Sequence, residues 1–286
     1  MYFCDKNYKS HIKETTIMTN RHDWPLASSR PAANFGDEML AAMQKAGVHY
    51  MELSSGAIEP FTETLDYVHN AKAIYAKAKA YDVTISSIHL PFAPFTKIDP
   101  AMADPDCRKY MYDLQSGLIK AAGDSGVDFA VIHPSGEPYK EEDRPEKMKY
   151  AIEMIASLTE AAKSAGMVLA LENLPRTCLC RTHDEMEAFL AAIPDLRVCF
   201  DTNHNLSEPN AEYIRAVGDK IVTLHVSDYD FIDEKHWFPM DGGIDWKELL
   251  SVLEEMNYTG RFTYETMPAG KTYEDLVENF NKLMNL

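Results

Sequence analysis

Residues 168–172 read Val-Leu-Ala-Leu-Glu, an apolar run that ends in a carboxylate. The same pattern returns at residues 198–201, Val-Cys-Phe-Asp, and at residues 221–225, Ile-Val-Thr-Leu-His. Short runs of this kind, bounded by polar loops, predict buried strands. A longer stretch with apolar residues at helical spacing follows each run. This alternation of strand and helix predicts a parallel sheet.

The pattern extends outward to cover the chain from about residue 22. Eight strands are predicted, at residues 24–28, 48–53, 83–89, 129–133, 168–172, 198–201, 221–225 and 262–265. Eight helices alternate with them, at residues 37–45, 64–81, 108–125, 144–165, 184–192, 211–217, 246–256 and 273–283. Eight such units predict an α/β fold, a single (β/α)₈ TIM barrel over residues 21–286, after an N-terminal tail over residues 1–20.

Glycines stand between predicted helices and the strands that follow. A left-handed residue ends many helices, and glycine adopts that conformation at the lowest cost. We therefore expect five glycines to end helices in this way: Gly47, Gly126, Gly166, Gly218 and Gly260.

Composition limits the partners and the location of the protein. The 286 residues include 28 Lys and Arg against 45 Asp and Glu, a net charge of −17, which argues against a surface built to bind a phosphate backbone. Nucleic acid is therefore not an expected partner. The longest apolar stretches, such as residues 167–171, are too short to cross a bilayer, so no membrane partner is expected. Five cysteines without a C-x₂-C pair fit a reducing, cytoplasmic location.

Most of the predicted strands end at or beside an ionisable or metal-binding side chain. These side chains are Glu52, His89, His133, Glu172, Asp201, His225 and Glu265. In a (β/α)₈ barrel the carboxyl ends of the strands converge on one pocket. Carboxylates and imidazoles at that density repel one another or must be desolvated unless a cation holds them, and they are normal ligands of Mn²⁺, Zn²⁺, Fe²⁺ or Co²⁺. The strand ends therefore predict a metal site.

Several motifs resemble those of the xylose isomerase-like TIM barrel family, which includes sugar isomerases, sugar epimerases and endonuclease IV. They are Leu171-Glu172-Asn173, Phe200-Asp201-Thr202-Asn203-His204, Leu224-His225-Val226, Tyr264-Glu265 and the loop over residues 234–246. Their order and spacing match together, and the resemblance covers nearly the whole chain from about residue 22.

The resemblance implies a ligand set and a chemistry. Glu172, Asp201, His225 and Glu265 would hold one divalent metal ion, with Mn²⁺ expected first and Zn²⁺, Co²⁺, Fe²⁺ or Mg²⁺ as alternatives. Glu172 and Glu265 would be the acid/base pair of a sugar isomerase or epimerase. A cation that binds the oxygens of a ketose or related hydroxy-ketone stabilises an enediolate, and a carboxylate on either face can remove or return the carbon-bound proton.

Other residues are expected to contact a sugar or a polyol-derived substrate. His204 faces the substrate by resemblance to ketose epimerases, and His89, His133 and His236 could hydrogen-bond its hydroxyls. Aromatic residues also stand at or after strand ends, namely Trp24, Phe92, Phe95, Trp237 and Phe238. Trp237 is the expected substrate wall because it adjoins His236.

Two alternatives stay open at this point. A dehydratase of inositol-derived ketones would use the same site to expel hydroxide. An endonuclease IV-like phosphodiesterase on abasic DNA would bind further zinc ions through His89 and His133, and through His204, Glu234 and His236. Glu234 departs from that pattern, which has Asp, and the net charge also weighs against DNA. A homo-oligomer is expected only by analogy of fold.

Four positions bear on the substrate and on the metal. The resembling 3-epimerases carry an arginine six residues after the ligating histidine, where this chain has Phe231. Arg176 and Arg181 could supply a cation that suits a carboxylate or phosphate on the substrate. Glu52 could orient a metal ligand or pair with a loop lysine.

Overall fold

The fold is a closed barrel of eight parallel strands, seen in a computed structural model that describes residues 19–286. The strands follow one another in chain order around the barrel, and β1 pairs with β8 to close it. They are β1 (Leu26–Pro31), β2 (Tyr50–Ser54), β3 (Thr84–His89), β4 (Phe129–Ile132), β5 (Val168–Glu172), β6 (Arg197–Asp201), β7 (Ile221–Val226) and β8 (Arg261–Tyr264). The predicted (β/α)₈ TIM barrel is confirmed.

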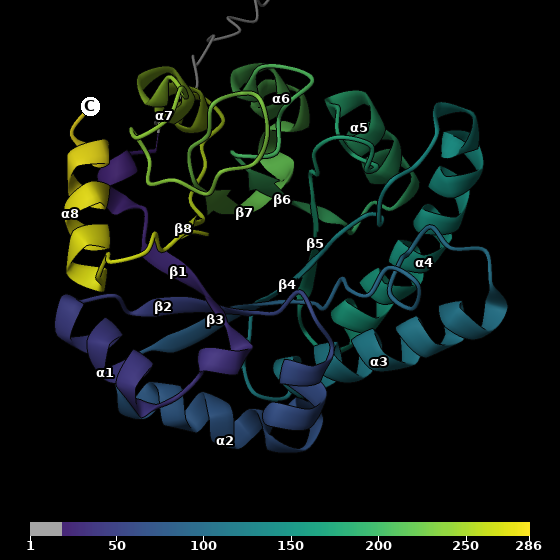
Figure 1. Cartoon of the computed structure of the whole chain (residues 1–286), viewed down its shortest axis with the longest axis horizontal. Coiled ribbons are helices and arrows are strands. Elements are labelled where there is room, and N and C mark those ends of the chain that lie inside the picture. The colour runs from purple at the N-terminus through teal and green to yellow at the C-terminus, as the bar shows by residue number, and fades with distance from the viewer. Residues whose placement is uncertain (1–18) are drawn as a thin grey trace, which may run out of the picture.

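The eight α-helices of residues 19–286 form a ring outside the strands (Figure 1). They are α1 (Asp37–Ala46), α2 (Tyr67–Ala80), α3 (Pro105–Gly123), α4 (Arg144–Ser164), α5 (His183–Ala192), α6 (Asn210–Val217), α7 (Trp246–Glu255) and α8 (Tyr273–Met284). Every predicted helix is present, with ends that differ by at most a few residues. No helix within residues 19–286 combines the length and the apolar character needed to cross a membrane.

The first predicted strand lies too early in the chain. β1 begins at Leu26, and Trp24 is a buried residue that precedes the strand. Its indole N–H donates a hydrogen bond to the carbonyl oxygen of Tyr258 at 2.7 Å, and its ring stacks on Phe262. The predicted tail lies outside the described residues except for Thr19 and Asn20. The Asn20 side chain accepts a hydrogen bond from the His22 backbone N–H.

The glycine prediction is correct at four positions and wrong at one. Gly47, Gly126, Gly166 and Gly218 have positive φ angles, but Gly260 does not. The left-handed residue after α7 is Asn257, with φ of 57°. Gly260 is needed for space instead, because a Cβ atom there would overlap the Val222 carbonyl oxygen and the Tyr258 hydroxyl.

The barrel interior changes from apolar to polar along the strands. Val131, Ala170 and Cys199 form a small buried cluster inside it. Alternate residues of a strand point to the same side, so the side chains two positions onward lie one layer higher. Those positions are His133, Glu172 and Asp201. A layer of small apolar side chains therefore underlies the polar strand ends.

Two glycine substitutions test how tightly the barrel constrains the chain. We expect Gly260→Ala to lower the free energy of unfolding by about 1–3 kcal/mol, since the new methyl group meets backbone. Gly117→Ala, in the middle of α3, should raise it by roughly 0.5–1 kcal/mol, because that site has room and alanine favours helix. Urea unfolding followed by circular dichroism measures both. Equal effects of the two changes would contradict this account of Gly260.

Candidate metal centre

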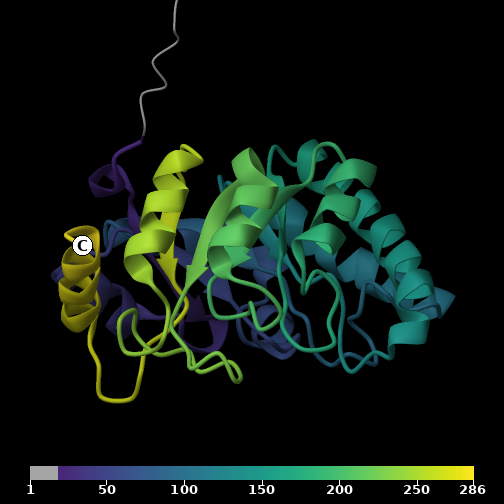
Figure 2. The same cartoon turned by 90° about the horizontal axis from the view of Figure 1, so that it is seen from above.

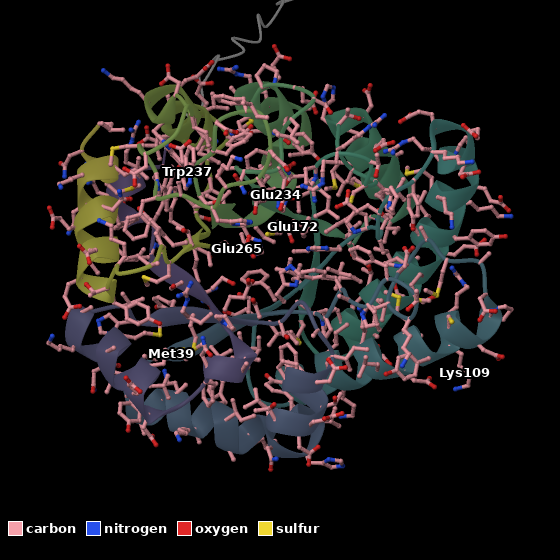
Figure 3. The ribbon with its side chains drawn as sticks, in the orientation of Figure 1. Met39, Lys109, Glu172, Glu234, Trp237 and Glu265 are labelled. Carbon is pink, nitrogen blue, oxygen red and sulfur yellow. The ribbon has the colours of Figure 1, made fainter. Side chains whose placement is uncertain are left out.

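A cavity of about 180 Å³ lies at the carboxyl ends of the strands. Figure 2 shows the long connections after the strands, among them the β7–α7 loop, gathered on one side of the barrel. The residues that line the cavity are Phe92, Phe95, His133, Ser135, Glu137, Glu172, Leu174, Pro175, Arg176, Cys178, His204, Glu234, His236 and Glu265. Figure 3 shows Glu172, Glu234 and Glu265 close together near the centre of the barrel. The fold thus brings together side chains that are far apart in sequence.

The four residues expected to hold a metal ion meet below this cavity. Glu172, Asp201, His225 and Glu265 each offer one ligand atom, and these atoms all lie within 4.8 Å of one another. His225 Nδ1 is 3.0 Å from Glu172 Oε1, 3.4 Å from Glu265 Oε2 and 4.0 Å from Asp201 Oδ2. Glu265 is the most accessible of the four, with 23% of its side chain exposed. The set has the composition and spacing of a divalent-cation site.

One buried oxygen atom of Asp201 has no hydrogen-bond partner within residues 19–286. The Asp201 Oδ1 accepts a hydrogen bond from the Asn203 backbone N–H, whereas the buried Oδ2 accepts none from the described residues. The Asn173 side chain fixes the end of β6, since it accepts from the Asp201 N–H and donates to the Asp201 carbonyl oxygen. A buried carboxylate oxygen without a donor is costly. A cation at this point would satisfy it.

The pKa shifts of the three carboxylates also indicate a place for a cation. Burial and the neighbouring Glu172 raise the pKa of Asp201 to about 6. Burial, together with the charges of Glu172 and Asp201, raises the pKa of Glu265 to about 7, although His225 opposes the shift. Burial also acts to raise the pKa of Glu172, but His225 and two further histidines hold it well below its usual value. Three carboxylates here repel one another unless a cation lies between them.

Two histidines hold the other oxygen of Glu172. Its Oε2 is 3.0 Å from His89 Nε2 and 3.3 Å from His133 Nε2. Phe92 stacks on the His133 ring at 4.1 Å between centroids. His133 lines the cavity, as expected of a substrate contact, but His89 does not, because it is 2% exposed and lies beneath the cavity. His89 supports Glu172 from within the barrel.

Two other histidines, His204 and His236, are held by backbone carbonyl groups at Nδ1. His204 Nδ1 lies 2.8 Å from the Asn173 carbonyl oxygen, and His236 Nδ1 lies 3.1 Å from the Glu265 carbonyl oxygen. A carbonyl oxygen only accepts, so each Nδ1 carries a proton and each Nε2 is left to other partners. The two Nε2 atoms lie 3.8 and 3.9 Å from Glu234. All three residues could therefore bind polar groups of a ligand.

Trp237 does not take the place expected for it. It is absent from the residues that line the cavity, and Figure 3 shows it apart from Glu172 and Glu265. Its backbone forms an antiparallel bridge with Asp228. The Asp228 carboxylate also accepts hydrogen bonds from the backbone N–H groups of Met240 and Ile244. This folding of the loop turns Trp237 away, and Phe92 and Phe95 supply the aromatic wall instead.

The mouth of the cavity contains an ion-pair network that the sequence does not predict. Arg176 lies 2.6 Å from Glu137, 2.8 Å from Asp233 and 2.9 Å from Glu234. The network joins the loops after β4, β5 and β7. Arg181 instead pairs with Glu141. The sequence analysis did not include Glu137 among the site residues. Its position four residues after His133, in the loop that follows β4, could have identified it.

Phe231, at the position where the resembling epimerases carry arginine, lies away from the cavity. Phe231 is 51% exposed, and its ring lies against Tyr229, with 4.7 Å between centroids. It does not line the cavity. Arg176 is the one arginine among the cavity-lining residues.

Comparisons with known proteins agree with the fold and with the family resemblance. The family model described as "Xylose isomerase-like TIM barrel" matches residues 40–283. An uncharacterised protein of Methanocaldococcus jannaschii is 25% identical over 268 residues, 89% of each chain. Fructoselysine 3-epimerase of Shigella flexneri is 26% identical over 204 residues, 68% of this chain and 72% of the relative. The crystal structure of a D-tagatose 3-epimerase-like protein superposes with a TM-score of 0.72 at 21% identity, covering 91% of this chain and 98% of that one.

Cation binding should stabilise the folded chain. We expect Mn²⁺ at 100 times its Kd to raise the free energy of unfolding by about 2.7 kcal/mol over a chelator-treated sample, because the folded site binds the cation and the unfolded chain does not. Thermal denaturation with and without Mn²⁺ measures the effect. Asp201→Asn should weaken it by removing the charge of the unsatisfied oxygen. Equal stabilisation of wild type and Asp201→Asn would argue against this ligand set.

Proposed function

Because the chain belongs to the xylose isomerase-like TIM barrel family, we propose that it is a divalent-metal-dependent epimerase of ketoses or related hydroxy-ketones. The observation that carries this proposal is the meeting of Glu172, Asp201, His225 and Glu265 ligand atoms within 4.8 Å at the floor of a small cavity. The similarity to fructoselysine 3-epimerase favours epimerisation over aldose–ketose isomerisation.

The donor set suits Mn²⁺ or a similar cation, which supplies Lewis acidity for a carbonyl group and its neighbouring hydroxyl. Glu265 and Glu172 are the proposed acid/base pair. One carboxylate takes the proton from the carbon beside the carbonyl group, and the other returns a proton to the opposite face of the same carbon. The configuration of that carbon inverts, and no atom is gained or lost.

The two glutamates are held differently, which suits two distinct roles. Glu172 Oε2 is fixed by His89 and His133, so this carboxylate has a defined direction. Among the described residues no pair of histidines holds Glu265 in this way, and 23% of its side chain is exposed at the cavity. Glu265 is therefore the carboxylate with more freedom to approach the substrate carbon.

The remaining polar groups of the cavity can orient the sugar. His204 and His236 hold their Nδ1 protons on backbone carbonyl groups, so their Nε2 atoms are left to hydrogen-bond substrate hydroxyls. His133 lines the same cavity beside the stacked ring of Phe92. Phe92 and Phe95 offer an apolar surface for the face of a sugar ring or chain.

The mouth of the cavity favours a substrate without a phosphate group. Arg176 is already paired with Glu137, Asp233 and Glu234, so three carboxylates surround one guanidinium group. A phosphate would have to displace a carboxylate from Arg176 and lie beside the others. We therefore assign the substrate to the non-phosphorylated sugars.

One observation favours the endonuclease-like alternative. His204, Glu234 and His236 offer ligand atoms within 4.8 Å of one another, which is a second candidate set for a metal ion. The carboxylates at the mouth and the net charge of −17 oppose the approach of a DNA backbone. The sugar epimerase is therefore the proposed function.

Replacing the freer carboxylate should stop turnover without unfolding the chain. We expect Glu265→Gln to lower kcat by at least roughly 100-fold, since an amide cannot accept the proton from carbon. The assay incubates free ketoses and their phosphate esters with Mn²⁺-loaded protein in D₂O and follows deuterium at the epimerised carbon by NMR. The phosphate esters should react more slowly than the free sugars.

Two controls accompany that assay. Glu248→Gln, on the exposed side of α7, should leave the rate unchanged. Metal content is measured for each variant, so that loss of the cation is not mistaken for loss of a base. A normal rate for metal-loaded Glu265→Gln would contradict the proposed role of Glu265. Loss of water from the sugar would instead identify a dehydratase, and cleavage of an abasic duplex a nuclease.

A further inference from the structure

His225 is oriented in the opposite sense to three neighbouring histidines. His89, His204 and His236 each place Nδ1 at 2.8–3.1 Å from a backbone carbonyl oxygen. His225 instead turns Nδ1 toward Glu172, while its Nε2 lies 2.9 Å from Glu52 Oε1. The nitrogen offered to a cation is therefore decided by what holds the other nitrogen.

Glu52 is a buried carboxylate for which the proposed reaction has no use. It lies on β2 with none of its surface exposed. Ser29 on β1 donates a hydrogen bond to its Oε1 at 2.9 Å, and Ser87 on β3 donates one to its Oε2 at 3.0 Å. Within residues 19–286 it forms no ion pair with lysine or arginine, so the pairing with a loop lysine considered from the sequence is wrong. Its ionic partner is His225.

The hydrogen bonds around Glu52 define its role. Two serine hydroxyls and one ring nitrogen approach its two oxygens, which is the arrangement of an ionised carboxylate that only accepts. His225 Nε2 must then carry a proton. In a neutral imidazole the lone pair is consequently on Nδ1, the atom that lies beside Glu172 and Glu265.

We propose that Glu52 is a positioning residue that fixes the tautomer and ring orientation of His225 and so sets the affinity of the site for a divalent cation. Carboxylates that hold the far nitrogen of a ligating histidine commonly affect metal affinity in this way. The inference rests on the proposed function only in requiring that the four-residue set binds a cation. It does not depend on which sugar is the substrate.

Glu52 is also better placed for this role than a residue that only fills space. It comes from β2, three strands around the barrel from β7, and its two serine partners flank it on both neighbouring strands. A buried charge of this kind does not by itself favour stability, and a well-packed apolar side chain is often as stable. Metal affinity is therefore the property that distinguishes a positioning role from packing.

The test measures Mn²⁺ binding to the metal-free protein by isothermal titration calorimetry, with no sugar present. We expect Glu52→Gln to weaken binding by about 10–100-fold, because the amide keeps the shape but lacks the charge that supports His225. Ser87→Ala should give a smaller loss. Ser28→Ala is the matched control, because this buried hydroxyl on β1 has no hydrogen-bond partner in the described chain.

A second readout follows the tautomer itself. In protein labelled with ¹⁵N-histidine and loaded with Zn²⁺, the His225 signals should show a protonated Nε2 and a metal-bound Nδ1 in wild type. Glu52→Gln should change the chemical shifts of His225. It should change those of His204 much less, because Glu52 does not contact His204. If Glu52→Gln fails to fold, Ser87→Ala and Ser29→Ala carry the comparison.

The outcomes separate the two claims. Equal Mn²⁺ affinity and unchanged His225 signals in wild type and Glu52→Gln would overturn the role of Glu52 and leave the proposed function standing. Absence of Mn²⁺ binding by wild type would overturn both. Weakened binding in Glu52→Gln with normal binding in Ser28→Ala supports the proposal, even if no sugar tested is turned over.

Discussion

The repulsion among buried carboxylates around His225 is the constraint on which the rest of the site depends. Ligand atoms of Glu172, Asp201 and Glu265 lie within 4.8 Å of one another at the ends of three strands, and the burial of Glu172 and Asp201 removes water that would screen them. Burial and this repulsion together raise the pKa values of Asp201 and Glu265. A divalent cation would relieve this repulsion, and the fold surrounds the place where it would bind.

Strands and loops contribute different parts of the site. The strands supply the proposed ligands and a floor of small apolar residues, Val131, Ala170 and Cys199, which leaves space above for polar groups. The loops supply the histidines and aromatic rings that line the cavity. Arg176 ties three of those loops together at the mouth. The strands thus hold the proposed ligands, and loops shape access to them.

The sequence was most informative about the strands. Apolar runs with a polar last residue located Glu172, Asp201 and His225 correctly at strand ends, because barrel geometry makes those ends converge whatever the loops do. Loop geometry could not be predicted in the same way. Trp237 was expected in the cavity because it adjoins His236, but the hydrogen bonds of Asp228 fold the loop so that the two side chains separate.

Contacts between residues that are far apart in the sequence could not be predicted either, because the spacing of residues along the chain does not reveal them. The contacts of Arg176 with Glu137 and Glu234 join residues from separate βα units. The need for glycine at position 260 arises from the Val222 carbonyl group on the neighbouring strand. Both depend on how distant segments pack, whereas helix and strand periodicity depends only on local sequence.

The most direct test of the central claim is a crystal structure of Mn²⁺-loaded protein with anomalous diffraction collected at a wavelength where manganese scatters strongly. We expect one strong peak per chain, at coordination distance from Glu172, Asp201, His225 and Glu265. Peaks confined to His204, Glu234 and His236, or no peak among the four proposed ligands, would contradict the account.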